Sequence, residues 1–247
     1  MTALLQVLGL GRADVVAVAG AGGKTTLVYR LAREAREAGL RVLVTSTTHM
    51  GTLPEAVTGP VILEDEGDVG PRVEKVMRET GYATVLGRRV RPDKIEGIPG
   101  PRVDELASHA DLVVIEADGA RGRSLKVPAP HEPVIPRSTT AVVVVAALDV
   151  LGRPLDDALV HRVELVAAAT GRRPGEVVDE PAVASALVHP EGYPARVARG
   201  MRAAVFLNKA EDAATWAAAE RIAPRLLGTY ERVAAGSARG GEVRAWR

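Results

Sequence analysis

A glycine-rich turn near the N-terminus has the residue types that bind phosphate groups. Residues 20–26 read Gly-Ala-Gly-Gly-Lys-Thr-Thr, between the apolar run Asp14–Ala19 and a segment of helical periodicity that ends near Ala38. In such a turn, backbone N–H groups and the helix N-terminus point at a phosphate. We expect Lys24 to reach the β- and γ-phosphates and the Thr25 hydroxyl to bind Mg²⁺. The turn therefore predicts a nucleoside triphosphate site.

The spacing of this turn is shorter than in the usual phosphate-binding motif. Val18 stands where G-x-x-x-x-G-K-[ST] has its first glycine, so the pattern here is G-x-x-G-K-T, similar to the shorter form of Mur-type ligases. A glycine-rich turn without a ligand is the alternative interpretation. Few such turns combine these glycines with Lys-Thr-Thr between a strand and a helix, so we interpret the segment as a phosphate-binding loop.

A second group of candidate residues ends a later apolar strand. Residues 112–119 read Leu-Val-Val-Ile-Glu-Ala-Asp-Gly. Glu116 is expected to hold Mg²⁺ or its water, and the Gly119 N–H to contact a γ-phosphate. Asp118 follows on the same side of an extended chain and is the alternative acid for Mg²⁺ or for positioning a water molecule. We predict that Thr25, Glu116 and Asp118 are the Mg²⁺ ligands.

Two segments near the C-terminus have the order of guanine-recognition motifs. Residues 208–211 read Asn-Lys-Ala-Glu at the end of a predicted strand, and Ser237-Ala238 follows the next one. Guanine-nucleotide-binding proteins use N-K-x-D, whose Asp accepts hydrogen bonds from the base, and an S-A loop that donates a backbone N–H. Glu211 stands in place of that Asp, and Asn208 could instead cap the following helix. The sequence therefore favours GTP but leaves ATP open.

The basic residues after the acid-x-x-G turn are a third candidate group. Arg121, Arg123 and Lys126 could stabilise charge on a transferred phosphate, hold an anionic partner group, or form a solvated loop. We predict that Lys24, Glu116, Asp118 and Lys126 are catalytic. The predicted nucleotide-binding residues are Gly20, Ala21, Gly22, Gly23, Lys24, Thr25, Thr26, Asn208, Lys209, Glu211, Ser237 and Ala238.

Histidines and the end of the second strand are weaker candidates. His131-Glu132 could ligate a metal but more often such a pair is structural, and His161-Arg162 is expected at the surface. The segment Thr45–His49 leaves the second strand on the side of the phosphates, where it could contact Mg²⁺ or end as a plain polar turn.

Composition excludes several classes of protein. The 247 residues carry a formal net charge of +1, 3% are aromatic, and none is cysteine. Charge balance and few aromatic residues argue against nucleic acid binding, and the missing thiols exclude disulfides, thiolate metal sites and cysteine nucleophiles. No apolar run has the roughly 20 residues of a membrane span, and no signal peptide is recognisable. We expect a cytoplasmic protein.

Strands and helices alternate along most of the chain. Short Val-rich runs predict strands at Asp14–Ala19, Arg41–Thr47, Val61–Leu63, Tyr82–Val90, Asp111–Glu116, Ala141–Ala147, Ala203–Leu207 and Tyr230–Ala235. Helices are expected at Val69–Thr80 and Ala213–Leu227, a loop at Lys94–Pro101, and a frayed glycine-rich tail. This alternation predicts one α/β domain over residues 1–247, a doubly wound, mostly parallel sheet of P-loop NTPase type. Residues 150–202 are expected to form a helical insertion or lid, in which Asp156–His189 forms two or three helices separated by Pro174 and Pro181.

Several segments together resemble the YqeC family of selenium-dependent hydroxylase accessory proteins. They are VVAVAGAGGKTTLVYRLA, VLVTSTTH, DKIEGIPGPRVDEL, VVIEADGARGRSLKVPAPHEPVIP and LNKAED. The resemblance implies a P-loop NTPase-like protein linked to maturation of molybdenum hydroxylases. The strand-acid-x-x-G arrangement is also similar to that of the nickel-metallochaperone GTPases.

Three functions are compatible with these motifs. The first is a Mg²⁺-dependent nucleoside triphosphatase, using GTP or ATP, that acts as an accessory factor for a molybdenum hydroxylase or its cofactor-maturation machinery. The second is a small-molecule kinase or ATP-dependent ligase that uses the same phosphate loop. The third is a nucleotide-regulated binding module without hydrolysis. We expect neither nucleic acid nor membrane partners.

Overall fold

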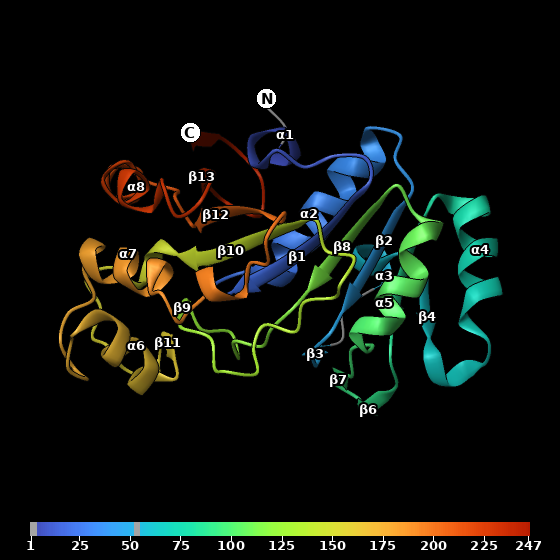
Figure 1. Ribbon diagram of the computed structural model, residues 1–247, viewed down its shortest axis with the longest axis horizontal. Coiled ribbons are helices and arrows are strands. Elements are labelled where there is room, and N and C mark those ends of the chain that lie inside the picture. Colours follow the sequence, from blue (N-terminus) through green and yellow to red (C-terminus); the bar gives the residue numbers. More distant parts are fainter. Residues whose placement is uncertain (1–3, 52–54) are drawn as a thin grey trace.

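A nine-stranded sheet forms the centre of the molecule (Figure 1), in a computed structural model that describes residues 4–51 and 55–247. Its strand order is β14-β13-β12-β10-β1-β8-β2-β5-β4, and every neighbouring pair is parallel except β13–β14. The strands are β1 (Asp14–Gly20), β2 (Val42–Ser46), β4 (Val61–Leu63), β5 (Tyr82–Leu86), β8 (Leu112–Glu116), β10 (Ala141–Ala147), β12 (Arg202–Asn208), β13 (Arg232–Gly236) and β14 (Val243–Trp246).

The central strands are buried on both faces. All seven residues of β1 and all seven of β10 are buried, as expected for Val- and Ala-rich parallel strands covered by helices. Side chains alternate between the faces, so Val16 and Val18 pack on one side and Ala17 and Ala19 on the other.

Helices cover both faces of this sheet (Figure 1). One face carries α1 (Leu4–Leu8) and α2 (Lys24–Glu37); in α2 the residues Leu27, Leu31 and Ala35 are buried at helical spacing. The other face packs against α4 (Val69–Thr80), α5 (Gly100–Leu106), α6 (Val163–Thr170), α7 (Glu180–Val188) and α8 (Ala213–Leu226). The predicted doubly wound, mostly parallel α/β fold is confirmed.

Short elements surround the carboxyl ends of the central strands. Three of them form a small antiparallel sheet in the order β3-β7-β6, and two form the parallel pair β11–β9. Their bounds are β3 (Met50–Gly51), β6 (Arg89–Arg91), β7 (Lys94–Ile95), β9 (Leu125–Lys126) and β11 (Val160–His161). The remaining elements are α3 (Glu55–Thr58) and short 3₁₀ turns at Glu64–Glu66, Ala107–His109, Leu148–Val150 and Pro194–Arg196.

Four segments differ from their predicted structure. The C-terminal tail is not frayed: β14 pairs antiparallel with β13, and its Trp246 packs against the core. The predicted strand Tyr82–Val90 divides at Gly87 into β5 and β6, because the chain turns there to form the small sheet. The predicted loop Lys94–Pro101 contains β7 and the first turn of α5. In residues 150–202, Pro181 does not separate helices but lies in the first turn of α7, where a missing N–H is tolerated.

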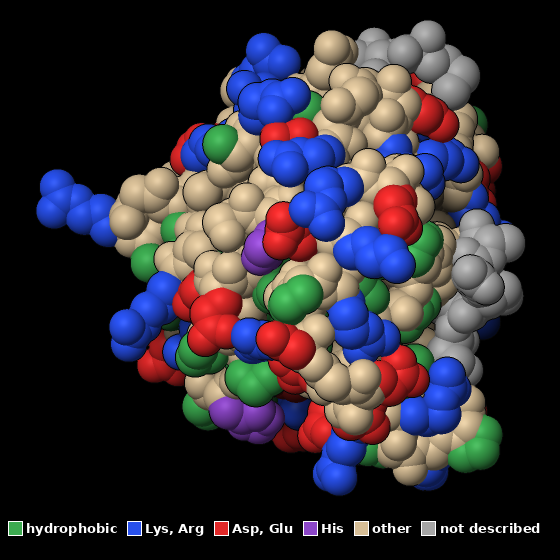
Figure 2. All heavy atoms as spheres, turned by 90° about the vertical axis from the view of Figure 1, so that its right-hand side faces the viewer, with side chains coloured by type: hydrophobic (Ala, Val, Ile, Leu, Met, Phe, Trp, Pro, Cys, Tyr) green, Lys and Arg blue, Asp and Glu red, His purple; other side chains and the backbone are tan. Residues whose placement is uncertain are grey.

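The surface has no strongly charged face in the view of Figure 2, which looks onto the side of α4 and β4. Basic and acidic side chains are interspersed there and hydrophobic ones form small patches, in agreement with the net charge of +1. Among residues 4–51 and 55–247, none of the helices has the length and hydropathy required to cross a membrane.

Candidate nucleotide-binding site

The loop between β1 and α2 requires glycine at specific positions. Gly20, Gly22 and Gly23 have φ values of 104°, 84° and 109°, a region that other residues rarely adopt. A Cβ on Gly20 would lie 2.1 Å from the Val145 carbonyl oxygen, and one on Gly22 would lie 2.3 Å from the Ala147 Cβ. The glycines therefore let the loop fold back against β10 while keeping its backbone close to the start of α2.

Lys24 lies at the centre of this loop with 4% of its surface exposed. Its Nζ donates a hydrogen bond to the Gly20 carbonyl oxygen at 2.8 Å. The same Nζ lies 3.3 Å from Asp118 Oδ1 and 4.0 Å from Glu116 Oε1. Both acids therefore approach the same ammonium group of the loop.

The Thr25 hydroxyl and the Glu116 carboxylate lie side by side at the start of α2. The Thr25 hydroxyl donates to Glu116 Oε2 at 2.7 Å. Burial raises the pKa of Glu116 and the neighbouring Asp118 charge adds to this, while Lys24 and Thr25 act in the opposite direction. A hydroxyl and a buried carboxylate suit Mg²⁺, which prefers oxygen ligands and keeps phosphate or water oxygens in its shell. Residues 4–51 and 55–247 hold no cluster of three acidic or histidine side chains that could bind a metal by itself.

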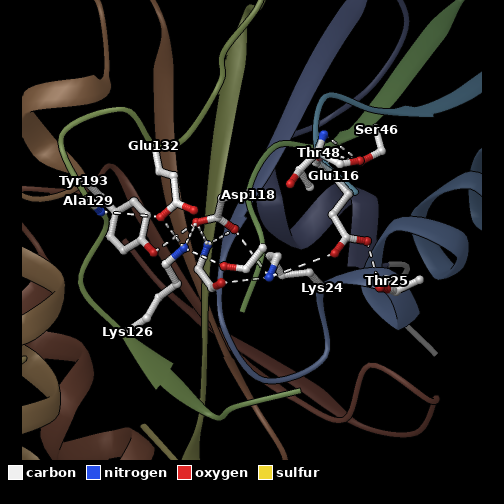
Figure 3. A network of polar contacts seen from close by, with 12 residues as sticks. Lys24, Thr25, Ser46, Thr48, Glu116, Asp118, Lys126, Ala129, Glu132 and Tyr193 are labelled. Atoms are coloured by element: carbon white, nitrogen blue, oxygen red, sulfur yellow. Dashed lines mark hydrogen bonds and ion pairs between the residues drawn. The ribbon is translucent and has the colours of Figure 1, made fainter. Parts of the chain in front are cut away.

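Asp118 is the centre of a buried polar network (Figure 3). Both of its carboxylate oxygens accept from the Gly20 N–H at 3.1 Å. Oδ2 lies 3.0 Å from the Lys126 Nζ and accepts from the Tyr193 hydroxyl at 3.3 Å. The side chain of Asp118 is fully buried, and it holds the loop through the Gly20 N–H from the protein side. Glu116, in contrast, lines the cavity in front of the loop.

The network continues from Lys126 to the segment before α6. The buried Lys126 Nζ donates to the Gly119 carbonyl oxygen at 2.7 Å and to Glu132 Oε2 at 2.9 Å. Glu132 in turn pairs with Arg162 through both guanidinium nitrogens. Burial alone would raise the pKa of Glu132, but Arg162 and Lys126 outweigh it and lower that pKa to about 2. Arg162 is therefore not a plain surface residue, as the sequence suggested, but a half-buried partner of Glu132.

The predicted base-recognition residues meet at the other end of the loop. The Asn208 Nδ2 donates to the Gly22 carbonyl oxygen at 2.6 Å, and its Oδ1 accepts from the Ala238 N–H at 2.8 Å. The Ser237 hydroxyl donates to Glu211 Oε1 at 2.7 Å. Asn208 does not cap the following helix, because the side chain of Asp212 does so. The structure thus joins the two segments that the sequence placed far apart.

A cavity of about 790 Å³ opens in front of the phosphate loop. Of the predicted site residues, it is lined by Gly22, Gly23, Lys24, Thr25, Thr26 and Glu116. Gly20, Ala21, Asp118 and Lys126 are buried outside its lining. The five base-recognition residues also lie outside it: Asn208 and Ala238 are buried, Lys209 and Ser237 are partly buried, and Glu211 is exposed. The further walls come from Gly119–Arg123, β3, β7 and the segment Val160–Arg162.

Two members of the site have no recognisable signal in the sequence. Tyr193 is fully buried, and burial together with the Asp118 charge raises its hydroxyl pKa. Nothing in the spacing of Tyr193 or Arg162 relates either of them to a loop more than a hundred residues earlier.

Comparison with known proteins gives three similarities. Residues 16–164 match the family described as YqeC protein. The protein named "Uncharacterized protein YqeC" of Escherichia coli (strain K12) is 33% identical over 208 residues, which cover 82% of this chain and 80% of that protein. The crystal structure of FtsY from Mycoplasma mycoides aligns with a TM-score of 0.41 and 12% identity, over 95% of this chain and 64% of that chain's length.

Proposed function

This chain belongs to the YqeC family, and from that premise we propose that it is a Mg²⁺-dependent protein that binds and hydrolyses a nucleoside triphosphate as an accessory factor for a molybdenum hydroxylase. The observation that carries the nucleotide part is the placement of Lys24, Thr25 and Glu116 together at the mouth of a glycine loop. A point charge, a hydroxyl and a carboxylate are the side chains that a bound Mg²⁺-triphosphate needs there.

Each of these residues has a distinct role in the proposal. The backbone N–H groups of the loop and the start of α2 bind the phosphates, and Lys24 neutralises their β- and γ-oxygens. Thr25 and Glu116 would hold the Mg²⁺ ion, which supplies charge neutralisation to the phosphates when it is bound. Gly119 lines the cavity beside Glu116, so its N–H can contact the terminal phosphate.

Asp118 and Lys126 act as positioning residues in this proposal. Both side chains are fully buried and neither lines the cavity. Asp118 holds the Gly20 N–H, and Lys126 holds the Gly119 carbonyl oxygen. The two residues thereby fix the two glycine segments between which the phosphates would lie.

The base is proposed to bind beside Asn208, Lys209, Glu211, Ser237 and Ala238. The Glu211 carboxylate already accepts from Ser237, which places an acid beside the loop that would recognise the base. Lys209 adopts a left-handed conformation with φ of 62°, and its Nζ pairs with Asp149 at 2.5 Å. This arrangement supports guanine as the preferred base, because an acid can accept from both guanine N–H groups on one edge.

Co-expression tests the accessory role. A molybdenum hydroxylase is produced with the wild-type protein or with its Lys24→Ala variant, and its molybdenum content and specific activity are measured. The proposal expects full activity only with the wild-type chain, and Lys75→Ala on α4, an exposed lysine in a charged helix, serves as the control. Equal hydroxylase activity with and without the chain would contradict the accessory role. It would not contradict nucleotide binding, which is measured separately.

A further inference from the structure

The cavity in front of the phosphate loop continues away from the base-recognition segments. None of the five base-recognition residues lines it, although Asn208 contacts the loop itself. Besides the loop, its lining includes Arg121, Arg123, His161 and Arg162, and we call the part that these four residues line the far part of the cavity. A nucleotide that places its base beside Asn208 and its phosphates on the loop therefore leaves the far part of the cavity free for another group.

The lining of the cavity as a whole has an excess of positive charge. Arg162 is neutralised by Glu132, and Lys24 by Glu116 and Asp118. Within the part of the chain that the structure describes, Lys94, Arg121 and Arg123 line the cavity without an ion-pair partner, against Asp157 as the one unpaired acid in the lining. Three unpaired positive charges against one unpaired negative charge leave an excess of two, which matches the charge of a dianionic group.

His161 has a lowered pKa, for which burial is the largest cause. Burial lowers the pKa of this imidazole, and the charges of Lys126, Arg162 and Arg121 lower it further, with Glu132 opposing them. The imidazole is therefore neutral near pH 7 and can donate one hydrogen bond to an anion without a further change of charge.

Two arginines of this cavity hold strained backbone conformations. Arg121 has φ of 49° and Arg162 has φ of 58°. Among the described residues, four that are not glycine have positive φ, and these two face the same cavity. Such conformations persist where the surrounding structure enforces them, and they gather at binding and catalytic sites.

We propose that Arg121, Arg123 and His161 bind the phosphate group of a second small-molecule ligand while the nucleotide occupies the loop. The proposal rests on the proposed nucleotide site and names a ligand class for the rest of its cavity. Arginine is suited to this role because its planar guanidinium makes two parallel hydrogen bonds to phosphate oxygens. The ligand is small because the free space is only the remainder of a cavity of about 790 Å³.

Titration with inorganic phosphate tests this site. The protein is saturated with Mg²⁺ and a non-hydrolysable β,γ-imido nucleotide, and phosphate binding is measured by calorimetry. The variant Arg121→Gln/Arg123→Gln is compared with Arg89→Gln/Arg91→Gln, whose exposed arginines lie on β6 outside the cavity and carry the same charge. We expect phosphate to bind the loaded wild-type protein, and to bind the Arg121/Arg123 variant at least tenfold more weakly than the control, with nucleotide affinity unchanged.

Other outcomes would overturn the proposal. One is phosphate that binds only the nucleotide-free protein and is displaced by the nucleotide. Another is a loss of nucleotide affinity in the Arg121/Arg123 variant as large as its loss of phosphate affinity, which would assign these arginines to the nucleotide. If no nucleotide binds at all, the proposed function fails. The same phosphate titration on nucleotide-free Lys24→Ala still decides the second site. Phosphate affinity that depends on Arg121 and Arg123 supports the site, and affinity that is independent of them overturns it.

Discussion

Both carboxylate oxygens of Asp118 accept a hydrogen bond from the N–H of Gly20, at 3.1 Å each. This contact joins the end of β8 to the first residue of the phosphate loop. The same carboxylate pairs with Lys126 and accepts from Tyr193, so the loop is also connected to the residues after α7. The geometry of the candidate phosphate site therefore depends on a buried network that extends well beyond the loop.

Asp118→Asn is expected to destabilise the fold strongly. The substitution leaves the ammonium groups of Lys24 and Lys126 buried with less negative charge around them, and breaking a buried ion pair typically costs about 3–5 kcal/mol. Urea unfolding followed by circular dichroism measures the free energy of unfolding. Glu74→Gln is the control, since its partner Arg78 lies on the exposed face of α4 and surface pairs contribute little. Equal unfolding free energies for both variants would contradict the central role of Asp118.

Glu132 is expected to contribute stability that depends on pH. Its pKa is about 2 in the folded protein against 4.5 for an ordinary glutamate, so its contribution is complete above about pH 4.5 and is lost as the pH falls toward 2. The shift corresponds to stabilisation on the order of 3 kcal/mol at neutral pH. In urea unfolding, the difference between wild type and Glu132→Gln should be full at pH 7 and should fall by more than half at pH 3. A difference that stays constant over this range would show that Glu132 does not titrate as described.

Asn208→Ala is expected to weaken the binding of every nucleotide. The substitution leaves the Gly22 carbonyl and the Ala238 N–H without their partner in a buried region. Each unsatisfied buried group costs about 1–3 kcal/mol, so the free energy of unfolding should also fall. GTP and ATP affinities, measured by calorimetry, should decrease together, because the loop and not the base contact is disturbed. A loss for only one of the two nucleotides would contradict this, because it would show that Asn208 contacts the base directly and does not act through the loop.

Glu211→Ala separates base recognition from phosphate binding. Glu211 is exposed and accepts from Ser237, so its removal should leave the fold intact. We expect GTP affinity to fall about tenfold, the effect of losing one hydrogen bond to a charged group, and ATP affinity to stay the same. Competition between the two nucleotides for one fluorescent analogue measures both values, with Glu220→Ala on α8 as the control. Unchanged GTP affinity would remove Glu211 from the base site.

The main sheet and the residues that line the phosphate loop could be predicted from the sequence because their signals are local. Val-rich runs of five to seven residues define β1, β8 and β10, and glycine, lysine and threonine occur together in the loop. Asp118 was predicted as a site residue, but not its burial, because an acid two residues after a strand can point into the site or into the core.

The rest of the site could not be predicted because it depends on distant contacts. Arg162 and Tyr193 reach the network through the packing of residues 150–202 against β9 and β10. The sequence does not predict the C-terminal strand β14, because the turn before it contains two adjacent glycines, Gly240 and Gly241, which are typical of flexible tails. The strand forms because it pairs with the edge of β13, and no local sequence pattern reveals such a pairing.

Calorimetric titration with GTP and ATP tests the nucleotide site most directly. The wild-type protein is compared with Lys24→Ala, Thr25→Val and the control Lys75→Ala, each in Mg²⁺ and in EDTA, after circular dichroism has verified folding. We predict that the wild-type and control proteins bind at least one nucleotide in Mg²⁺. Lys24→Ala should lose this binding, and Thr25→Val should lose its Mg²⁺ dependence. Wild-type protein that binds neither nucleotide in Mg²⁺, or binding that is equal in Lys24→Ala, would contradict the account.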